Sequence, residues 1–502
     1  MNRSKKTVLN TAMSIAAEFV AIICGFILPR LVLKNFGSQY NGLTTSITQF
    51  LSMAVLLRGG IGGATRAALY KPLAQKNDKE VSAIVRATDL FMKKVGMILG
   101  VSIVAFAAVY SIITIDEFEW LFTFSLFLII GVSTFVESFA GITYLILLQA
   151  DQKLWVSSLL GIIGSILNTV IASILILSGA SIHLVKLGSA LVFVAKPIAM
   201  QIYVRKTYHL DLNCEPDNRA ISQRWDAFWH QLASFVMNNT DVMVLTVFSN
   251  MLEVSVYSVY NMVIHNINRI ILSFTSGLEA AFGNMIAKGE NKALKENLSV
   301  TEWIINSITT VICSVSGLLI FEFVTLYTKG VHDVEYIRPA FGYIIIAAQF
   351  FTCTRMPSLL VVQAAGRYKE TRNGAILEPI LNISLSIALV IKFGLVGVAI
   401  GTLAATLFRT VQYSYFASKN IVNRNILIFP IKIIIYICNI AIIFLIWNKL
   451  GIEPAHNYLT WVLHGIIGIM LSTAIVMITS VSVFNKDMRL AFKKVKNLRK
   501  SR

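Results

Sequence analysis

The chain has 502 residues, of which 56% are hydrophobic and only 14% are charged. A soluble protein of this length would carry about a quarter charged residues, so the composition excludes an ordinary soluble enzyme or binding domain. The formal net charge of +18 is spread between apolar runs along the whole chain, which argues against a nucleic-acid-binding surface. The sequence therefore predicts a polytopic, all-α membrane protein.

Apolar runs long enough to cross a bilayer as a helix recur from end to end. The first of them contains Glu18 and lacks a small-residue cleavage site, so we interpret it as a retained helix and not as a signal peptide. We predict about 14 transmembrane helices, near 7–30, 41–64, 88–114, 118–148, 154–178, 182–204, 228–249, 254–285, 299–327, 338–362, 375–392, 394–418, 427–448 and 457–484.

Basic residues mark the predicted inner side of the membrane. Lys and Arg gather in the even-numbered connections, such as 66–86, 288–295 and 367–372, and at both termini. Cytoplasmic loops carry an excess of Lys and Arg, so both termini are predicted to lie in the cytoplasm.

The two halves of the chain match at an offset of about 213 residues. The offset joins 67–79 to 280–292, 147–153 to 361–367, and 188–196 to 401–409, which pairs Lys196 with Arg409. Each repeat holds six spans and keeps its orientation, and parallel repeats of this kind are a transporter architecture. The predicted parts are an N-terminal half at 1–204, a cytoplasmic linker at 205–227, a C-terminal half at 228–420, an additional hairpin at 421–484 and a basic amphipathic tail at 485–502.

Polar stripes on several predicted spans indicate a polar cavity between the halves, because polar side chains are costly against lipid. The clearest stripe lies on the span 254–285. Cavity residues predicted to bind substrate are Arg269, Arg409, Lys196, Arg355, Arg58, Asn268, His265 and Asn238. Acidic candidates for ion coupling are Glu18, Asp241 and Glu279.

Each of these charges has an alternative role in an ion pair between helices. Arg269 would bind an anionic headgroup through its donor fork, or would pair with Asp241 or Glu279. Arg58 lies a quarter turn or more from the polar stripe of its span, so it has the further alternative of reaching toward the lipid headgroups.

Two segments carry a family resemblance: FILPRLVLKNFGSQYNGL at 26–43 and GGIGGATRAALYKPLA at 59–74. They resemble the bacterial polysaccharide flippases of the multidrug/oligosaccharidyl-lipid/polysaccharide exporter superfamily. The resemblance implies a V-shaped cavity that opens alternately to each side of the bacterial inner membrane. It also implies a substrate linked to undecaprenyl pyrophosphate, and the polysaccharide polymerase machinery as a partner. That family typically has an acidic residue where this chain has Arg58, so no role transfers to that position.

Three other functions are alternatives to the flippase. A cation-coupled multidrug exporter of the same superfamily would have a cavity dominated by carboxylates, whereas here five interior cations face four acids, Glu137 among them. A membrane glycosyltransferase would need a sizeable outer catalytic loop, and a non-transporting scaffold would not explain the polar stripes. The sequence predicts no catalytic residue, cofactor or metal site, because its five cysteines and seven histidines show no ligand spacing and no phosphate-binding glycine loop occurs.

Local patterns add two structural expectations. Pro197 and Pro357 fall inside predicted spans, where kinks are expected. In the tail, Met488, Phe492, Val495 and Leu498 recur every three or four residues among basic ones, which predicts an amphipathic helix on anionic lipid of the inner leaflet.

Overall fold

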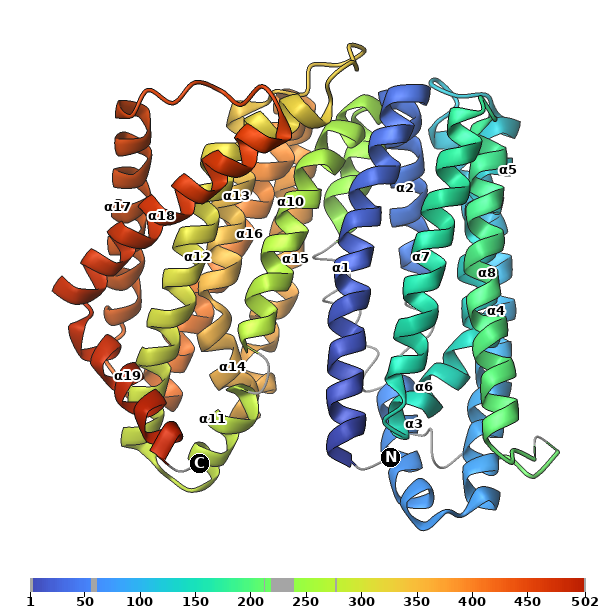
Figure 1. Cartoon of the computed structure of the whole chain (residues 1–502), viewed down its shortest axis with the longest axis horizontal. Coiled ribbons are helices and arrows are strands. Elements are labelled where there is room, and N and C mark those ends of the chain that lie inside the picture. Colours follow the sequence, from blue (N-terminus) through green and yellow to red (C-terminus); the bar gives the residue numbers. More distant parts are fainter. Residues whose placement is uncertain (1–2, 56–60, 212, 218–238, 276–277, 501–502) are drawn as a thin grey trace. The chain divides into compact units, whose positions relative to one another are not determined.

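The structure, a computed structural model, describes residues 3–55, 61–211, 213–217, 239–275 and 278–500. Every regular element among these residues is helical (Figure 1). Eleven of the described helices are long and apolar enough to cross a membrane. The predicted all-α, multi-pass fold is therefore confirmed.

The chain divides into two compact units, unit 1 at Met1–Ser255 and unit 2 at Val256–Arg502. Unit 1 contains α1 (Arg3–Phe36), α2 (Ser38–Val55), α3 (Ile61–Gln75), α4 (Asp78–Ile113), α5 (Trp120–Val136), the π-helical turn η2 (Glu137–Gly141), α6 (Ile142–Ala150), α7 (Leu154–Leu177), α8 (Ile182–Thr207) and the short helix Asn239–Phe248. The helix α10 (Met251–Thr275) begins in unit 1 and continues into unit 2.

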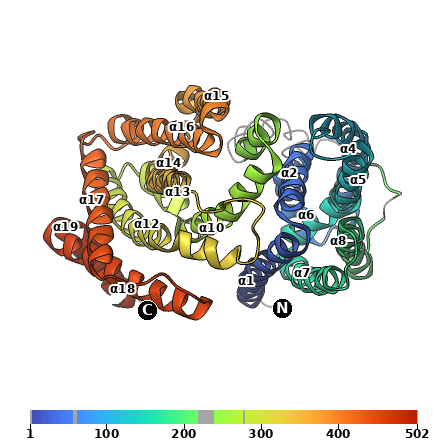
Figure 2. The same ribbon diagram turned by 90° about the horizontal axis from the view of Figure 1, so that it is seen from above.

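Unit 2 continues with α11 (Leu278–Ala287), α12 (Asn291–Tyr327), α13 (Pro339–Thr354), α14 (Met356–Ala364), α15 (Tyr368–Phe393), α16 (Leu395–Phe416), η4 (Ala417–Ile421), α17 (Ile428–Lys449), α18 (Tyr458–Ser482) and α19 (Asn485–Lys500). Figure 2 shows α17, α18 and α19 along one edge of this unit, next to α12. Each predicted span falls mostly on helix where the structure describes it, with differences of a few residues at the ends and with the span 338–362 divided at Arg355. Residues 56–60 of the second span, 228–238 of the seventh and 276–277 of the eighth lie outside the described residues, as do 212 and 218–227 of the predicted linker.

Small residues explain how the segment 26–43 folds in unit 1. Gly37 separates α1 from α2 with a φ of 90°, a backbone conformation that glycine adopts without a steric penalty. One turn further on, a Cβ built at Gly42 would lie 1.9 Å from the carbonyl oxygen of Met251. Only a residue without a side chain permits this approach of α2 to the start of α10.

The helices α15 and α16 of unit 2 are joined along a seam of glycines. A Cβ at Gly397 would lie 2.4 Å from the carbonyl oxygen of Leu389, and one at Gly401 would lie 2.4 Å from the Ser386 hydroxyl oxygen and 2.8 Å from its backbone nitrogen. The two helices are therefore packed backbone to backbone, as small residues allow in membranes.

Of the two spans in which a proline kink is expected from the sequence, only one is divided into two helices. Pro357 stands in the first turn of α14, directly after the point at Arg355 where α13 ends. Proline lacks the amide hydrogen and collides with the preceding turn, which accounts for the division of this span. Pro197 remains inside the single helix α8.

Candidate functional site

A cluster of charged side chains lies buried between α13, α15 and α16 of unit 2. Glu378 of α15 accepts a hydrogen bond of 2.5 Å from the Arg355 Nη1 atom, and its other carboxylate oxygen lies 3.4 Å from the Nε atom of Arg409. The exposed side-chain fractions of Glu378 and Arg409 are 8% and 3%. Two of the predicted cavity cations, Arg355 and Arg409, are thus brought together on one carboxylate.

The guanidinium group of Arg409 is hydrogen-bonded to residues of α15 and α16. Its guanidinium donates to the carbonyl oxygen of Thr371 at 3.0 Å, to the side-chain oxygen of Gln412, and to the Tyr413 hydroxyl at 2.5 Å. The same group stacks over the Tyr413 ring at 3.9 Å from the centroid, a favourable cation–π distance. These contacts fix the position of Arg409 in the cluster.

Arg355 is the accessible member of the cluster, with 15% of its side chain exposed. It stands at the break between α13 and α14, where Leu359 N–H donates to the Arg355 carbonyl at 3.0 Å. Among the described residues, the two guanidinium groups and the one carboxylate of this cluster leave one surplus positive charge. A buried surplus charge costs several kcal/mol unless an opposite charge joins it, so the cluster is suited to an anion.

Unit 1 has a pocket around Lys196 that is lined by both polar and apolar side chains. Its volume is about 270 Å³, and among its lining residues are Glu137, Lys196 and the hydroxyl residues Ser133, Thr134 and Ser157. The π-helical turn η2 begins at Glu137, and such turns inside membrane helices often occur at functional sites. A Cβ at Gly141, the last residue of the turn, would lie 3.2 Å from the Pro197 Cβ atom, so glycine lets α8 approach here.

The Arg355–Glu378–Arg409 cluster and the Lys196 pocket fall at equivalent places of the predicted repeat. The offset of 214 places η2 (Glu137–Gly141) over 351–355, the end of α13, and the offset of 213 places Lys196 over Arg409. Both spans therefore depart from a regular α-helix at the same position of the predicted repeat. The neighbouring basic residue is Lys196 of α8 in unit 1 and Arg409 of α16 in unit 2. The acidic residue differs, because unit 1 places Glu137 on the irregular turn while unit 2 places Glu378 on α15.

The other predicted site residues do not take part in the contacts described for these two sites, or they lie outside the described chain. Arg269 and His265 are exposed on α10 within unit 2, and the buried side-chain oxygen of Asn268 has no hydrogen-bond partner among the described residues. Asp241 is buried in unit 1, while Glu18 and Glu279 are exposed within their units. Arg58 and Asn238 lie outside the described residues. No group of side chains that could hold a metal ion occurs in the part of the chain that the structure describes.

Glu378 was missed by the sequence analysis, together with Gln412 and Tyr413. A carboxylate only four residues inside the apolar run 375–392 was a usable signal, because an acidic residue within a span needs a partner. Its neighbour Pro379 and the basic connection before it made the position resemble a helix end.

Comparisons with known proteins give a fold but no sequence family. No family model and no curated protein sequence matches the chain. Among solved structures, the lipid II flippase MurJ in an inward closed conformation aligns with a TM-score of 0.68 at 16% identity, covering 94% of this chain and 100% of that one. An inward-facing multidrug resistance MATE family transporter of the MOP superfamily aligns with a TM-score of 0.65 at 12% identity, covering 82% of this chain and 98% of that one.

A third structure, the Vibrio cholerae MATE transporter VcmN in its bent form, has a TM-score of 0.51 at 15% identity over 83% of this chain and 97% of that one. All three similarities extend over nearly the whole of the known proteins. The chain therefore has the fold of MOP-superfamily transporters.

Proposed function

We propose that the protein is an alternating-access flippase that moves a lipid-linked oligosaccharide from the inner to the outer leaflet of the bacterial cytoplasmic membrane, for cell-surface polysaccharide assembly. The observation that carries the proposal is the surplus positive charge of the cluster formed by Arg355, Glu378 and Arg409. In the proposal, the carrier is undecaprenyl pyrophosphate, whose headgroup supplies the missing negative charge. Arginine suits this role because its planar donor fork binds phosphate oxygens in pairs.

Arg355 would make the first contact with the pyrophosphate. It is the more exposed of the two arginines, and it stands where the helix is already interrupted. A phosphate oxygen that replaces Glu378 as its acceptor would gain a charge-assisted hydrogen bond, while Glu378 would keep Arg409 as its partner. The Lys196 pocket offers a second cation, in the other half of the chain.

A cation-coupled multidrug exporter is the second candidate function. The similarity to MATE transporters and the presence of Glu137 among the hydroxyl groups of the unit 1 pocket favour it, because a carboxylate attracts cations. The two functions differ in the cargo that the purified protein moves, and one assay can separate them.

The test uses the full-length protein in proteoliposomes that contain a fluorescent undecaprenyl-pyrophosphate oligosaccharide. Dithionite, which does not cross the bilayer, reports the rate at which the labelled lipid changes leaflet. Arg355→Gln is expected to lower this rate at least about tenfold, because a charge-assisted hydrogen bond contributes about 1.5–3 kcal/mol. Arg355→Lys should restore it only in part, since an ammonium group has no donor fork.

Arg367→Gln is the matched control, because Arg367 is exposed in the same unit and pairs with the exposed Glu370 at 2.8 Å. Its rate should equal that of the wild type.

Arg269→Ala belongs in the same assay, and it is expected to fold normally and lose flipping if Arg269 also binds the headgroup. Rescue of Arg269→Ala by removal of Asp241 or Glu279 would instead assign Arg269 to an ion pair. Wild-type protein that moves cationic drugs and leaves the labelled lipid in place would refute the flippase and support the exporter.

A further inference from the structure

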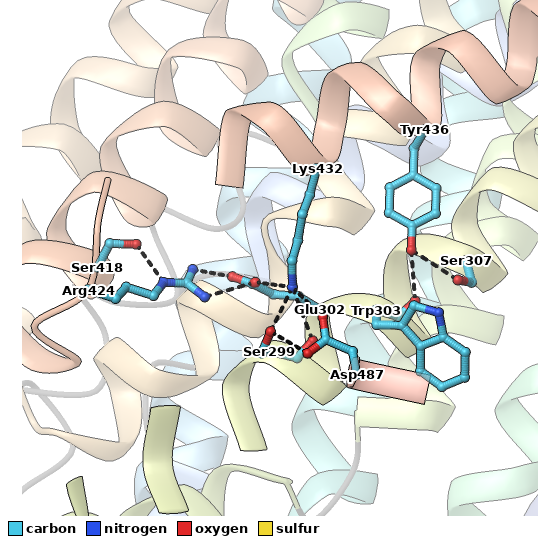
Figure 3. Close-up of polar contacts among 9 residues, drawn as sticks. All are labelled: Ser299, Glu302, Trp303, Ser307, Ser418, Arg424, Lys432, Tyr436 and Asp487. Atoms are coloured by element: carbon cyan, nitrogen blue, oxygen red, sulfur yellow. Dashed lines mark hydrogen bonds and ion pairs between the residues drawn. The ribbon is translucent and has the colours of Figure 1, made fainter. Parts of the chain in front are cut away.

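A second buried charge cluster of unit 2 ties the C-terminal helix α19 to the membrane-spanning helices (Figure 3). Glu302 of α12 accepts hydrogen bonds from Arg424, at 2.9 Å through one oxygen and more closely through the other, and lies 3.3 Å from the Lys432 Nζ atom of α17. Lys432 also donates to Asp487 of α19 at 3.0 Å. One ammonium group therefore bridges a carboxylate of a membrane span and a carboxylate of the tail helix.

The cluster is closed and balanced in charge. Two cations, Arg424 and Lys432, face two carboxylates, Glu302 and Asp487, and no side chain of the four is more than 13% exposed. Ser299 completes the contact by donating its hydroxyl to Asp487 at 2.8 Å. Since every charge has an opposite partner, the cluster can remain buried and hold the first turn of α19 in one orientation.

The corner between α18 and α19 is fixed as well. Only two residues separate the end of α18 at Ser482 from the start of α19 at Asn485, and Phe484 is buried there and stacks on the Tyr436 ring at 5.2 Å. The hydroxyl of Tyr436 donates to the Trp303 carbonyl at 3.3 Å (Figure 3). The tail helix therefore starts where a membrane-spanning helix ends, with no linker that would carry it away from the bilayer surface.

With Asp487 directed at the cluster, basic residues occupy the opposite side of α19. At 100° per residue, Lys486, Arg489 and Lys493 fall within an arc of about 60° that faces away from Asp487. All three are exposed, and so is Phe492 beside them, at 59%. The sequence continues at the same spacing with Lys496 and Lys500.

We propose that α19 is a lipid-binding element whose basic face, formed by Lys486, Arg489 and Lys493, binds the anionic phospholipid headgroups of the leaflet at which α18 ends. Asp487 and its buried partners are the positioning residues that direct this face outward. The occupant follows from charge complementarity and from the direct continuity of α19 with a membrane span. Each cation near an anionic bilayer surface strengthens binding about fivefold. Removal of all three cations is therefore expected to weaken the binding of α19 to anionic lipid measurably.

The experiment measures hydrogen exchange of residues 485–500 in full-length protein placed in nanodiscs. One set of discs contains only phosphatidylcholine, and the other contains about 30% phosphatidylglycerol. The wild-type tail helix is expected to exchange at least about tenfold more slowly in the anionic discs. A variant with Lys486→Gln, Arg489→Gln and Lys493→Gln should lose this difference between the lipids.

The matched control removes three exposed lysines of the same unit by Lys288→Gln, Lys292→Gln and Lys295→Gln, and it should keep the difference. If the triple tail variant fails to fold, the single substitution Lys493→Gln should still reduce the difference by a factor of about five. Asp487→Asn should speed exchange of α19 in both kinds of disc, because the helix loses its attachment.

Three results would overturn the proposal. The first is equal exchange of the wild-type tail in neutral and anionic discs, which would mean that the basic face is merely solvated. The second is an equal loss of the lipid effect in the Lys288, Lys292 and Lys295 control, which would assign it to overall charge. The third is equal slowing by inorganic phosphate in neutral discs, which would identify a soluble anion as the ligand. None of these readouts depends on flippase activity.

Discussion

Glu378 determines how much positive charge unit 2 keeps buried. It is the shared partner of Arg409, which is buried, and of Arg355, which is mostly buried. A buried ion pair contributes little net stability by itself, but the loss of one partner leaves an uncompensated charge, which is strongly destabilising. The carboxylate therefore has a structural role distinct from the ligand-binding role proposed for the arginines.

Glu378→Gln is expected to destabilise the protein by roughly 3–5 kcal/mol, because two buried guanidinium groups then lack a counter-charge. The thermal unfolding temperature in detergent measures the effect. Adding Arg355→Gln to this variant should recover part of the loss, since it restores the original surplus of one charge. The control Glu370→Gln breaks an exposed pair with Arg367 and should leave the unfolding temperature unchanged. An unchanged unfolding temperature for Glu378→Gln would contradict the ion-pair geometry.

The sequence indicates some residues of these buried charged sites, but it does not indicate which of them form pairs. Lys196, Arg355 and Arg409 stand out as charges inside apolar runs, and the repeat pairs Lys196 with Arg409. The sequence does not show with which carboxylate they pair, because Glu378 meets Arg355 only after α13, α15 and α16 have packed. The same holds for Asp487, whose partners Lys432 and Ser299 lie 55 and 188 residues away.

At the scale of elements, apolar run length predicted the helices well, and local chemistry explains several of their ends. Asn457 begins α18 with a capping box, in which its side chain accepts from Thr460 N–H at 2.9 Å while the Thr460 hydroxyl accepts from Asn457 N–H at 3.3 Å. Pro357 indicated an irregularity in its span. The π-helical turn at Glu137 had no comparable signal in the sequence, and its last residue, Gly141, approaches Pro197 only in the folded unit 1.

The seam between α15 and α16 gives a prediction at this scale. Gly401→Ala places a methyl group 2.4 Å from the Ser386 hydroxyl oxygen and 2.8 Å from its backbone nitrogen, so the helices must separate. Overpacking of this kind costs about 1–3 kcal/mol, which should lower the thermal unfolding temperature.

Gly465→Ala in α18 is the matched control, because its Cβ would make an ordinary contact of 3.6 Å with Leu319. It should unfold at the wild-type temperature or slightly above, since alanine favours helix over glycine. Equal effects of the two substitutions would refute the close packing of the seam.

For the whole molecule, the hydrophobic pattern predicts which segments cross the membrane, and the distribution of basic residues predicts on which side each loop lies. The pattern gives the membrane-spanning helices, which the structure confirms among the described residues. The side of the membrane on which each loop lies follows only from the excess of Lys and Arg, because the packing of helices is the same for either orientation. Orientation therefore stays a prediction that needs a measurement in cells.

Cysteine labelling in intact cells provides that measurement. In a background with the five native cysteines replaced by serine, Lys76→Cys is expected to resist a membrane-impermeant maleimide until the cells are opened. Ser178→Cys, in the connection between α7 and α8, should react in intact cells. Both positions are exposed in unit 1, so access to the reagent differs only by membrane side. Labelling of Lys76→Cys from outside would reverse the predicted topology.

The glycine seam has a mechanical consequence. Where α15 and α16 approach at Gly397 and Gly401, no side chain separates their backbones, so sliding of one helix along the other would bring main-chain atoms into collision. We therefore expect α15 and α16 to move together as one rigid pair in any conformational change. Glu378 and Arg409 both belong to this pair, whereas Arg355 stands between α13 and α14. Movement of the pair would then alter the contact of Glu378 with Arg355 and keep its contact with Arg409.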